Sequence, residues 1–214
     1  MIALFHWFVK ITGWLPQKLV FRTKVYYEDE AVQGRKIKGK AIVAPNHTSL
    51  FDYAVMMFLF PTRTLRGLVA EVMYNKGFLM RLFFACLGTI RVDRTTNDFS
   101  FIDKSRRVLE RGGVIEIYPE ARLPDPGDER LLPFKPSTVY LALETDTPII
   151  PVFSTGKLFC KERNRVIIGT PFYVQDMIDE SLSTTENVQI ITQRLRGKII
   201  ELEQQLAEKA EKDR

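Results

Sequence analysis

The sequence predicts a single α/β domain in which a mixed, mostly parallel sheet is flanked by helices, with an amphipathic helix at the N-terminus. Two observations support this fold class. Apolar strand-like runs alternate with helix-like runs along most of the chain, and glycine or proline residues separate them. With 214 residues and 45% hydrophobic content, the chain is long enough for one domain with an ample core.

The expected elements follow one another in regular order. The strands are predicted over 39–45, 63–70, 89–94, 114–120, 148–153 and 165–174. The helices are predicted over 51–60, 77–88, 98–113 and 136–146, with a long amphipathic helix from Thr184. Gly88 and the pair Gly112–Gly113 mark helix ends, and Ser183 with Glu186 has the spacing of a capping box. We therefore divide the chain into an N-terminal segment 1–35, an α/β body 36–183 and a C-terminal helix 184–214.

The N-terminal segment has two chemically distinct helical faces. Large apolar side chains recur at helical spacing at Leu4, Trp7, Phe8, Ile11, Trp14 and Leu15. The opposite face carries His6, Lys10, Gly13 and Gln17, and Pro16 is expected to end the helix. The apolar run is too short and too interrupted to span a bilayer, which takes roughly 18 apolar residues. We expect a monotopic helix in a membrane interface, peripheral on the cytoplasmic face; the alternative is a helix packed on the protein's own core.

The charge distribution limits the possible partners. Residues 1–40 carry eight basic and three acidic side chains, which accounts for the whole net charge of +5. The remaining chain is balanced, so it lacks the basic face that nucleic-acid binding requires. Cys86 and Cys160 lie in apolar surroundings and are expected to be reduced core thiols. No cluster of potential ligands has metal-binding spacing, so we expect no metal site.

A histidine follows the predicted strand 39–45, in the stretch "APNHTSLFD". Within one helix, His47 and Asp52 would lie roughly 140° apart and could not pair. If His47 lies in the loop and Asp52 in the first helical turn, the carboxylate can orient the imidazole as a general base. The alternative is a core histidine bonded to an aspartate that serves the helix N-terminus. Ser49 is a weak candidate nucleophile and fits an N-cap better.

Charged side chains also follow two other predicted strands. "GTIRVDR" ends at Arg94, and "YPEAR" contains Glu120 and Arg122. Because arginine binds phosphate in a bidentate manner, the two arginines can hold a phosphomonoester while His47 acts on a nearby hydroxyl. The alternative is that each arginine is a surface charge or an ion-pair partner and that Glu120 neutralises Arg122.

Together these blocks resemble the 1-acyl-glycerol-3-phosphate acyltransferases, within the wider glycerolipid acyltransferases. "NHTSLFD" resembles their H-x4-D block, "GTIRVDR" the second block, "YPEAR" the third and "PIIPV" the fourth, in the family's order over about residues 40 to 155. The third block departs from the usual pattern. Ala121 stands where the family usually has glycine, and one residue is missing before the arginine, so either Arg122 or Leu123 occupies the arginine position.

The resemblance implies the glycerolipid acyltransferase fold and the transfer of a fatty acyl group from a thioester to a lysophospholipid hydroxyl, without a bound cofactor. The donor is acyl-CoA or acyl carrier protein, and 1-acyl-glycerol-3-phosphate, giving phosphatidic acid, is the first candidate acceptor. His47 would be the base and Asp52 its orienting partner; Arg94 and Arg122 would bind the acceptor, with Glu120 ordering the loop. The alternatives are glycerol-3-phosphate or another lysophospholipid as acceptor, or a lipid-binding protein without catalysis. Residues 78–87 either line an acyl tunnel or form a plain buried helix.

Overall fold

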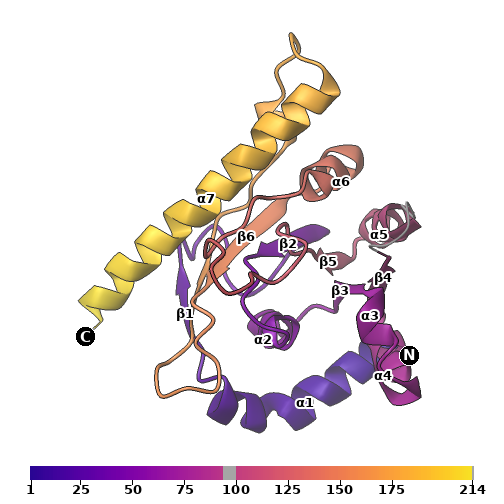
Figure 1. The fold of residues 1–214 in the computed structure, drawn as a ribbon, viewed down its shortest axis with the longest axis vertical. Helices are drawn as coiled ribbons and strands as arrows, with labels where there is room; N and C mark the ends of the chain where they lie inside the picture. The colour runs from indigo at the N-terminus through magenta and orange to yellow at the C-terminus, as the bar shows by residue number, and fades with distance from the viewer. Residues whose placement is uncertain (94–99, 214) are drawn as a thin grey trace.

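The computed structural model describes residues 1–93 and 100–213, which form a seven-stranded sheet covered by helices on both faces (Figure 1). The strands are β1 (Lys24–Tyr27), β2 (Ala41–Pro45), β3 (Leu65–Ala70), β4 (Ile90–Val92), β5 (Val114–Glu116), β6 (Ile149–Ser154) and β7 (Arg165–Ile168). The helices are α1 (Ile2–Val20), α2 (Asp52–Leu59), α3 (Glu71–Tyr74), α4 (Phe78–Leu87), α5 (Ser100–Glu110), α6 (Ser137–Thr145) and α7 (Thr184–Lys212), with a 3-10 turn η1 (Gln175–Met177).

The sheet is mixed and mostly parallel, as predicted. Its strand order is β1-β7-β6-β2-β5-β3-β4. The strands β6, β2, β5, β3 and β4 run parallel to one another, whereas β7 is antiparallel to β6 and pairs with β1. The carboxyl ends of five neighbouring strands therefore meet at one edge, where reactive groups gather in folds of this kind.

Alternating side chains of β2 divide the core into two layers. Ile42 and Ala44 point into a cluster shared with α5, α6 and α7, whereas Ala41 and Val43 point into a cluster with α2. Figure 1 shows α7 and α6 on one side of the sheet and α2 on the other, with α1 outside α2. Because β2 is buried on both faces, all five of its residues are apolar.

Some predicted boundaries were wrong. The strand from Val114 ends at Glu116, and the chain turns at 119–120. The strand from Arg165 ends at Ile168, after which Phe172 forms an isolated bridge with Ile149. Gly88 closes α4 in the left-handed conformation and the capping box of α7 is present, both as predicted. Arg94 and the start of the predicted helix 98–113 lie outside the described residues. Cys160 is exposed and Cys86 half-buried, so neither is a core thiol.

Helix α1 packs on the protein through its polar face. His6 and Lys10 are its buried residues, and Nε2 of His6 lies 2.9 Å from the carbonyl oxygen of Leu87. Lys10 donates from Nζ to three carbonyl oxygens beyond the end of α2, at 2.6 to 3.1 Å: those of Phe60, Pro61 and Arg63. Burial lowers the pKa of Lys10 to about 8, so the ammonium form still predominates at neutral pH and can make these bonds.

The apolar face of α1 points away from the protein. Its exposed side chains are Leu4, Trp7, Phe8, Ile11, Trp14, Leu15 and Leu19. The helix thus packs on the protein, as the alternative had it, but its apolar face does not. The helix also continues past Pro16 to Val20, so the prediction that Pro16 ends it was wrong. Proline has no N–H to bond the carbonyl oxygen of Thr12, four residues earlier, but Thr12 is exposed, so water can bond that oxygen instead.

Helix α4 extends this exposed surface. Phe78, Leu79, Leu82 and Phe83 are exposed, so the interpretation of residues 78–87 as a plain buried helix is wrong. The rings of Phe5 and Phe83 meet edge-on at 6.0 Å, which joins α1 to α4. We call the exposed apolar residues of these two helices the apolar surface. Within the described residues, no helix has the length and apolarity needed to cross a bilayer.

Candidate active site

The loop after β2 is anchored by the side chain of Asn46. Its Nδ2 donates to the carbonyl oxygen of Ser154 at 3.0 Å, and its Oδ1 accepts from the Ser154 N–H at 2.7 Å. The amide thus pairs with β6 as a backbone group would and continues the ladder beyond Pro45. This contact determines where the following residue, His47, leaves the sheet.

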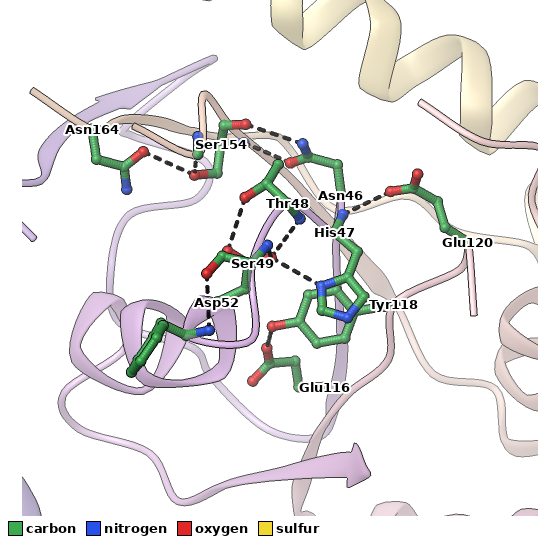
Figure 2. Close-up of polar contacts among 12 residues, drawn as sticks. Asn46, His47, Thr48, Ser49, Asp52, Glu116, Tyr118, Glu120, Ser154 and Asn164 are labelled. Carbon is green, nitrogen blue, oxygen red and sulfur yellow. Dashed lines mark hydrogen bonds and ion pairs between the residues drawn. The ribbon is translucent and has the colours of Figure 1, made fainter. Parts of the chain in front are cut away.

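His47 and Asp52 are in contact, as predicted. Nδ1 of His47 lies 2.9 Å from Oδ2 of Asp52, which is the first residue of α2 and is buried. The same carboxylate accepts from the backbone N–H groups of Thr48 and Ser49 at 2.6 and 2.8 Å, and from the Thr48 hydroxyl at 2.9 Å (Figure 2). With all these donors in place, the carboxylate holds a fixed position and fixes the orientation of the imidazole.

Ser49 has a structural role in this loop. The N-cap of α2 is Phe51, and Oγ of Ser49 accepts from the Phe51 N–H at 3.2 Å. Within the described residues, the Ser49 hydroxyl makes no hydrogen bond to His47. The N-cap prediction was therefore wrong by two residues.

Glu120 links the loop after β5 to the loop after β2. Its Oε1 accepts the backbone N–H of His47 at 2.7 Å, and its Oε2 accepts the N–H of Leu132 at 2.8 Å. Burial raises the pKa of the Glu120 carboxyl, although these two N–H groups oppose the rise. The carboxylate is thus engaged by backbone groups, and its predicted neutralisation of Arg122 was wrong.

The ring of His47 is stacked on Tyr118. Their ring centres are 4.1 Å apart, and the planes are inclined by 27°. The Tyr118 hydroxyl donates to Oε1 of Glu116 (Figure 2). Burial, together with the charge of Asp52, raises the pKa of Tyr118 well above its usual range, so this hydroxyl stays protonated.

Glu116 is a fully buried acid beneath this stack. Burial raises its pKa well above the usual value, against the hydrogen bond from Tyr118, and Oε2 has no partner among the described residues. Such an environment favours the neutral carboxyl group. The sequence reasoning missed the roles of Glu116 and Tyr118. The signal was their alternation with Glu120 in the predicted strand 114–120, although that strand ends at Glu116 and the chain turns over 118–121.

Of the two arginines predicted to bind the acceptor, Arg122 is described, and no hydrogen bond joins it to His47 within the described residues. Arg122 lies in an exposed loop, where its Nη1 donates to the carboxylates of Asp125 and Asp128 at 3.0 and 2.6 Å. Arg94 lies outside the described residues. Ala121, immediately before Arg122, has a φ of +61°, the left-handed conformation that glycine adopts most easily.

The arrangement can perform general base catalysis. The Nε2 atom of His47 has no hydrogen-bond partner in the described part of the chain, and 17% of the His47 side chain is exposed. An acceptor hydroxyl can therefore reach Nε2, while Asp52 holds Nδ1. No group of three His, Cys, Asp or Glu residues in the described ranges could hold a metal ion. The fold and the site together define an α/β protein with a histidine–aspartate pair at the carboxyl edge of its parallel strands.

Comparisons with known proteins identify the family. A family model described as "Acyltransferase" matches residues 22–155, which include every described site residue and most of the sheet. This protein belongs to that acyltransferase family.

Three characterised relatives carry related names. A 1-acyl-sn-glycerol-3-phosphate acyltransferase from Limnanthes alba is 33% identical over 129 residues, covering 58% of this chain and 44% of the relative. One from Cocos nucifera is 30% identical over 128 residues, covering 58% and 40%, and the human beta form is 24% identical over 169 residues, covering 78% and 60%. The chain thus spans less than two thirds of the length of each of these relatives.

A solved structure confirms the fold. The crystal structure of the 1-acyl-sn-glycerophosphate acyltransferase from Thermotoga maritima matches with a TM-score of 0.62 at 18% identity, over 86% of this chain and 73% of that one. The prediction of the glycerolipid acyltransferase fold is therefore confirmed.

Proposed function

We propose that this protein transfers a fatty acyl group from a thioester to the hydroxyl of 1-acyl-glycerol-3-phosphate, giving phosphatidic acid. The observation that carries the proposal is the 2.9 Å contact between Nδ1 of His47 and Oδ2 of Asp52, which leaves Nε2 open. The names of the family and of its relatives support the choice of reaction and acceptor.

In the proposed reaction, Nε2 of His47 takes the proton of the acceptor hydroxyl as its oxygen attacks the thioester carbonyl. The carbon–sulfur bond then breaks, and the imidazolium returns its proton to the departing thiolate. Asp52 stabilises the imidazolium and keeps Nε2 oriented toward the acceptor. A thiolate is a good leaving group, so these residues suffice for proton transfer without a bound cofactor.

Arg122 and Arg94 are proposed to bind the acceptor's phosphate. Arg122 would exchange its partners Asp125 and Asp128 for the phosphate. Its side chain is 46% exposed, and exposed ion pairs contribute only about 0–1 kcal/mol, so the exchange costs little. Glu120 would act indirectly, because its carboxylate holds the backbone of His47.

The apolar surface is proposed to lie in the interface of a bilayer. An exposed helical face with two tryptophans and several leucines is typical of monotopic membrane proteins. The acceptor and the product are lipids, so an enzyme resting on the bilayer can reach both. Cys86 and Cys160 are unpaired, which supports the cytoplasmic face.

An acyl-transfer assay with the purified chain tests the proposal. Two labelled donors are compared, acyl-CoA and acyl carrier protein loaded with the acyl group. Each is supplied with lysophosphatidate, glycerol-3-phosphate or a lysophosphatidylcholine. We expect turnover with lysophosphatidate and a loss of about 10³-fold or more in His47→Ala and His47→Gln, because the proton acceptor is removed. Unchanged melting temperatures would show that the variants fold.

Two outcomes would contradict the proposal. Full activity in both His47 variants would rule out the base. Vesicle binding without transfer to any acceptor would identify a lipid-binding protein instead. A preference for glycerol-3-phosphate would leave the reaction type intact and change the acceptor.

A further inference from the structure

A large basic cavity lies at the β3–β4 edge of the sheet, beside α5 and the first residues of α1. Its volume is about 970 Å³, and none of the residues around His47 lines it. Six basic side chains line it, and no acidic side chain does so within the described residues: Arg63, Arg66, Arg91, Lys104, Arg107 and Arg111. We call this cavity the basic groove.

None of the six cations of the basic groove has an ion-pair partner within the described residues. Arg63 donates to the carbonyl oxygen of Gly112 at 2.6 Å, and Lys104 donates to a serine hydroxyl at 3.3 Å. The other four arginines of the groove form no hydrogen bond or ion pair within residues 1–93 and 100–213. Four guanidinium groups around one cavity raise its positive potential, which favours an anionic ligand.

Helix α5 separates its paired and unpaired cations onto different faces. Lys104, Arg107 and Arg111 follow the i, i+3, i+7 spacing of one face, which lines the groove. Arg106 lies on another face and pairs with Asp103 and Glu144. Cations near a helix C-terminus are favoured by the helix dipole, which accounts for part of this stripe. The dipole of α5 does not account for Arg66 and Arg91, which come from β3 and β4.

A second basic cavity, at the other end of α1, behaves differently. It has a volume of about 720 Å³. Most of its cations are engaged within the protein: Lys10, Arg22 and Arg35 donate to carbonyl oxygens, and Lys24 pairs with Asp213. Of these two cavities, the basic groove therefore has more cations without a partner among the described residues.

The groove opens next to the apolar surface. Ile2 and Ala3 of α1 and Ala85 of α4 line it, and Ala3 is exposed. A helix lying in a membrane interface is buried by roughly 5–10 Å, at the boundary between acyl chains and headgroups. If α1 binds the bilayer as proposed above, the mouth of the groove lies at the level of the lipid phosphates.

We propose that the basic groove binds the phosphate headgroups of anionic membrane lipids, at a site separate from the acceptor site at His47. This inference rests on the proposed membrane association of α1, but not on the proposed reaction. Guanidinium groups bind phosphate oxygens in a bidentate manner, so several arginines can hold one headgroup or two adjacent ones. The site would favour anionic bilayers and restrict how the protein rotates on them.

Vesicle binding with matched variants tests the inference. Arg107 on α5 and Arg111, directly after its end, are both exposed, so Arg107→Gln with Arg111→Gln removes two charges from the groove without disturbing the core. The control, Arg194→Gln with Lys212→Gln, removes two charges from exposed positions of α7. Both tryptophans of the chain, Trp7 and Trp14, are exposed on α1, so a blue shift of their emission reports insertion directly.

With vesicles of phosphatidylcholine and phosphatidylglycerol, we expect the groove variant to bind about ten- to thirty-fold more weakly than wild type, since each cation near the surface contributes on the order of 1 kcal/mol. The control should change less than threefold. With phosphatidylcholine alone, all three proteins should bind equally. Salt should weaken the binding of wild type to anionic vesicles more than that of the groove variant.

Three results would overturn the inference. Equal weakening in the groove and control variants would mean that only net charge matters. Weaker binding of the groove variant to neutral vesicles would mean that α1 itself had been disturbed. No binding of wild type to either vesicle would remove the membrane association on which the inference rests. The proposed reaction is tested separately with substrates in neutral detergent micelles, where the groove variant should keep wild-type turnover.

Discussion

The loops that follow β2 and β5 leave the same edge of the sheet from adjacent strands, yet they are held in place very differently. In the loop after β2, each backbone N–H from 46 to 49 has a hydrogen-bond partner, and two of the four bond to Asp52. Beyond Glu120, the loop after β5 has an exposed arginine whose partners lie in the loop itself. The base must hold one geometry, whereas a group that meets a substrate phosphate must be able to release its partners.

The largest effect should come from the rigid loop. Asp52→Asn keeps the size of the side chain but removes the charge that stabilises the imidazolium. We expect kcat to fall by about 10³–10⁴ with little change in KM, because an amide can also select the wrong imidazole tautomer. Steady-state kinetics with lysophosphatidate measures this.

Asp29→Asn is the matched control for Asp52→Asn. Asp29 is exposed and accepts a local backbone N–H of its own turn at 2.9 Å. The control should keep wild-type kcat. If Asp52→Asn retained more than a tenth of wild-type kcat, Asp52 would be only a structural residue of the loop.

The next effect concerns the connection between the two loops. Glu120→Gln leaves one amide oxygen to serve two N–H donors, those of His47 and Leu132. One buried N–H then loses its acceptor, so we expect the free energy of unfolding to fall by about 1–3 kcal/mol. Because the His47 backbone also moves, kcat should fall by about ten- to a hundredfold. Chemical denaturation and kinetics on the same sample test both parts; normal kcat in a destabilised variant would show that the two loops are not coupled.

A smaller effect should distinguish whether Arg122 binds the acceptor. Arg122→Gln should raise the KM for lysophosphatidate by about three- to tenfold, since one exposed charge-assisted contact is lost. Asp128→Asn should instead lower KM by a few-fold, because it frees the guanidinium from a competing carboxylate. Opposite changes in KM at constant kcat would support the exchange of partners. An unchanged KM in both variants would limit Arg122 to holding its own loop.

The smallest expected effect concerns the backbone between Glu120 and Arg122. Ala121 has a φ of +61°, so Ala121→Gly relieves strain in the folded state but adds freedom to the unfolded chain. We expect a net gain of about 0.5 kcal/mol and unchanged turnover. Thermal unfolding measures the gain; a loss of stability would show that Ala121 makes contacts that outweigh the strain.

The parts of the site that depend on local sequence could be predicted. A buried strand followed by a histidine and, five residues later, by an aspartate at a helix start was enough to predict the pair His47 and Asp52. The contact of Glu120 with the His47 backbone joins positions 73 residues apart, which no local pattern reveals. The partners of Arg122 likewise depend on how an irregular loop closes.

The orientation of α1 shows a different limit. The spacing of Leu4, Trp7 and Ile11 correctly predicted an amphipathic helix with an apolar face. Periodicity alone does not say which face meets the protein, and here the polar one does, through His6 and Lys10. Apolar side chains are expected to point into the protein core only when the core is the one apolar environment open to them. A lipid bilayer or a partner protein is another such environment.

The contact between Lys10 and the three carbonyl oxygens beyond α2 also has a mechanical consequence. Apolar packing tolerates sliding and rolling, whereas an ammonium group held by three acceptors permits little rotation about the helix axis. The contact therefore fixes the orientation of α1 relative to the rest of the protein. If α1 lies in a membrane interface as proposed, this attachment would hold the rest of the protein at a fixed orientation to the bilayer.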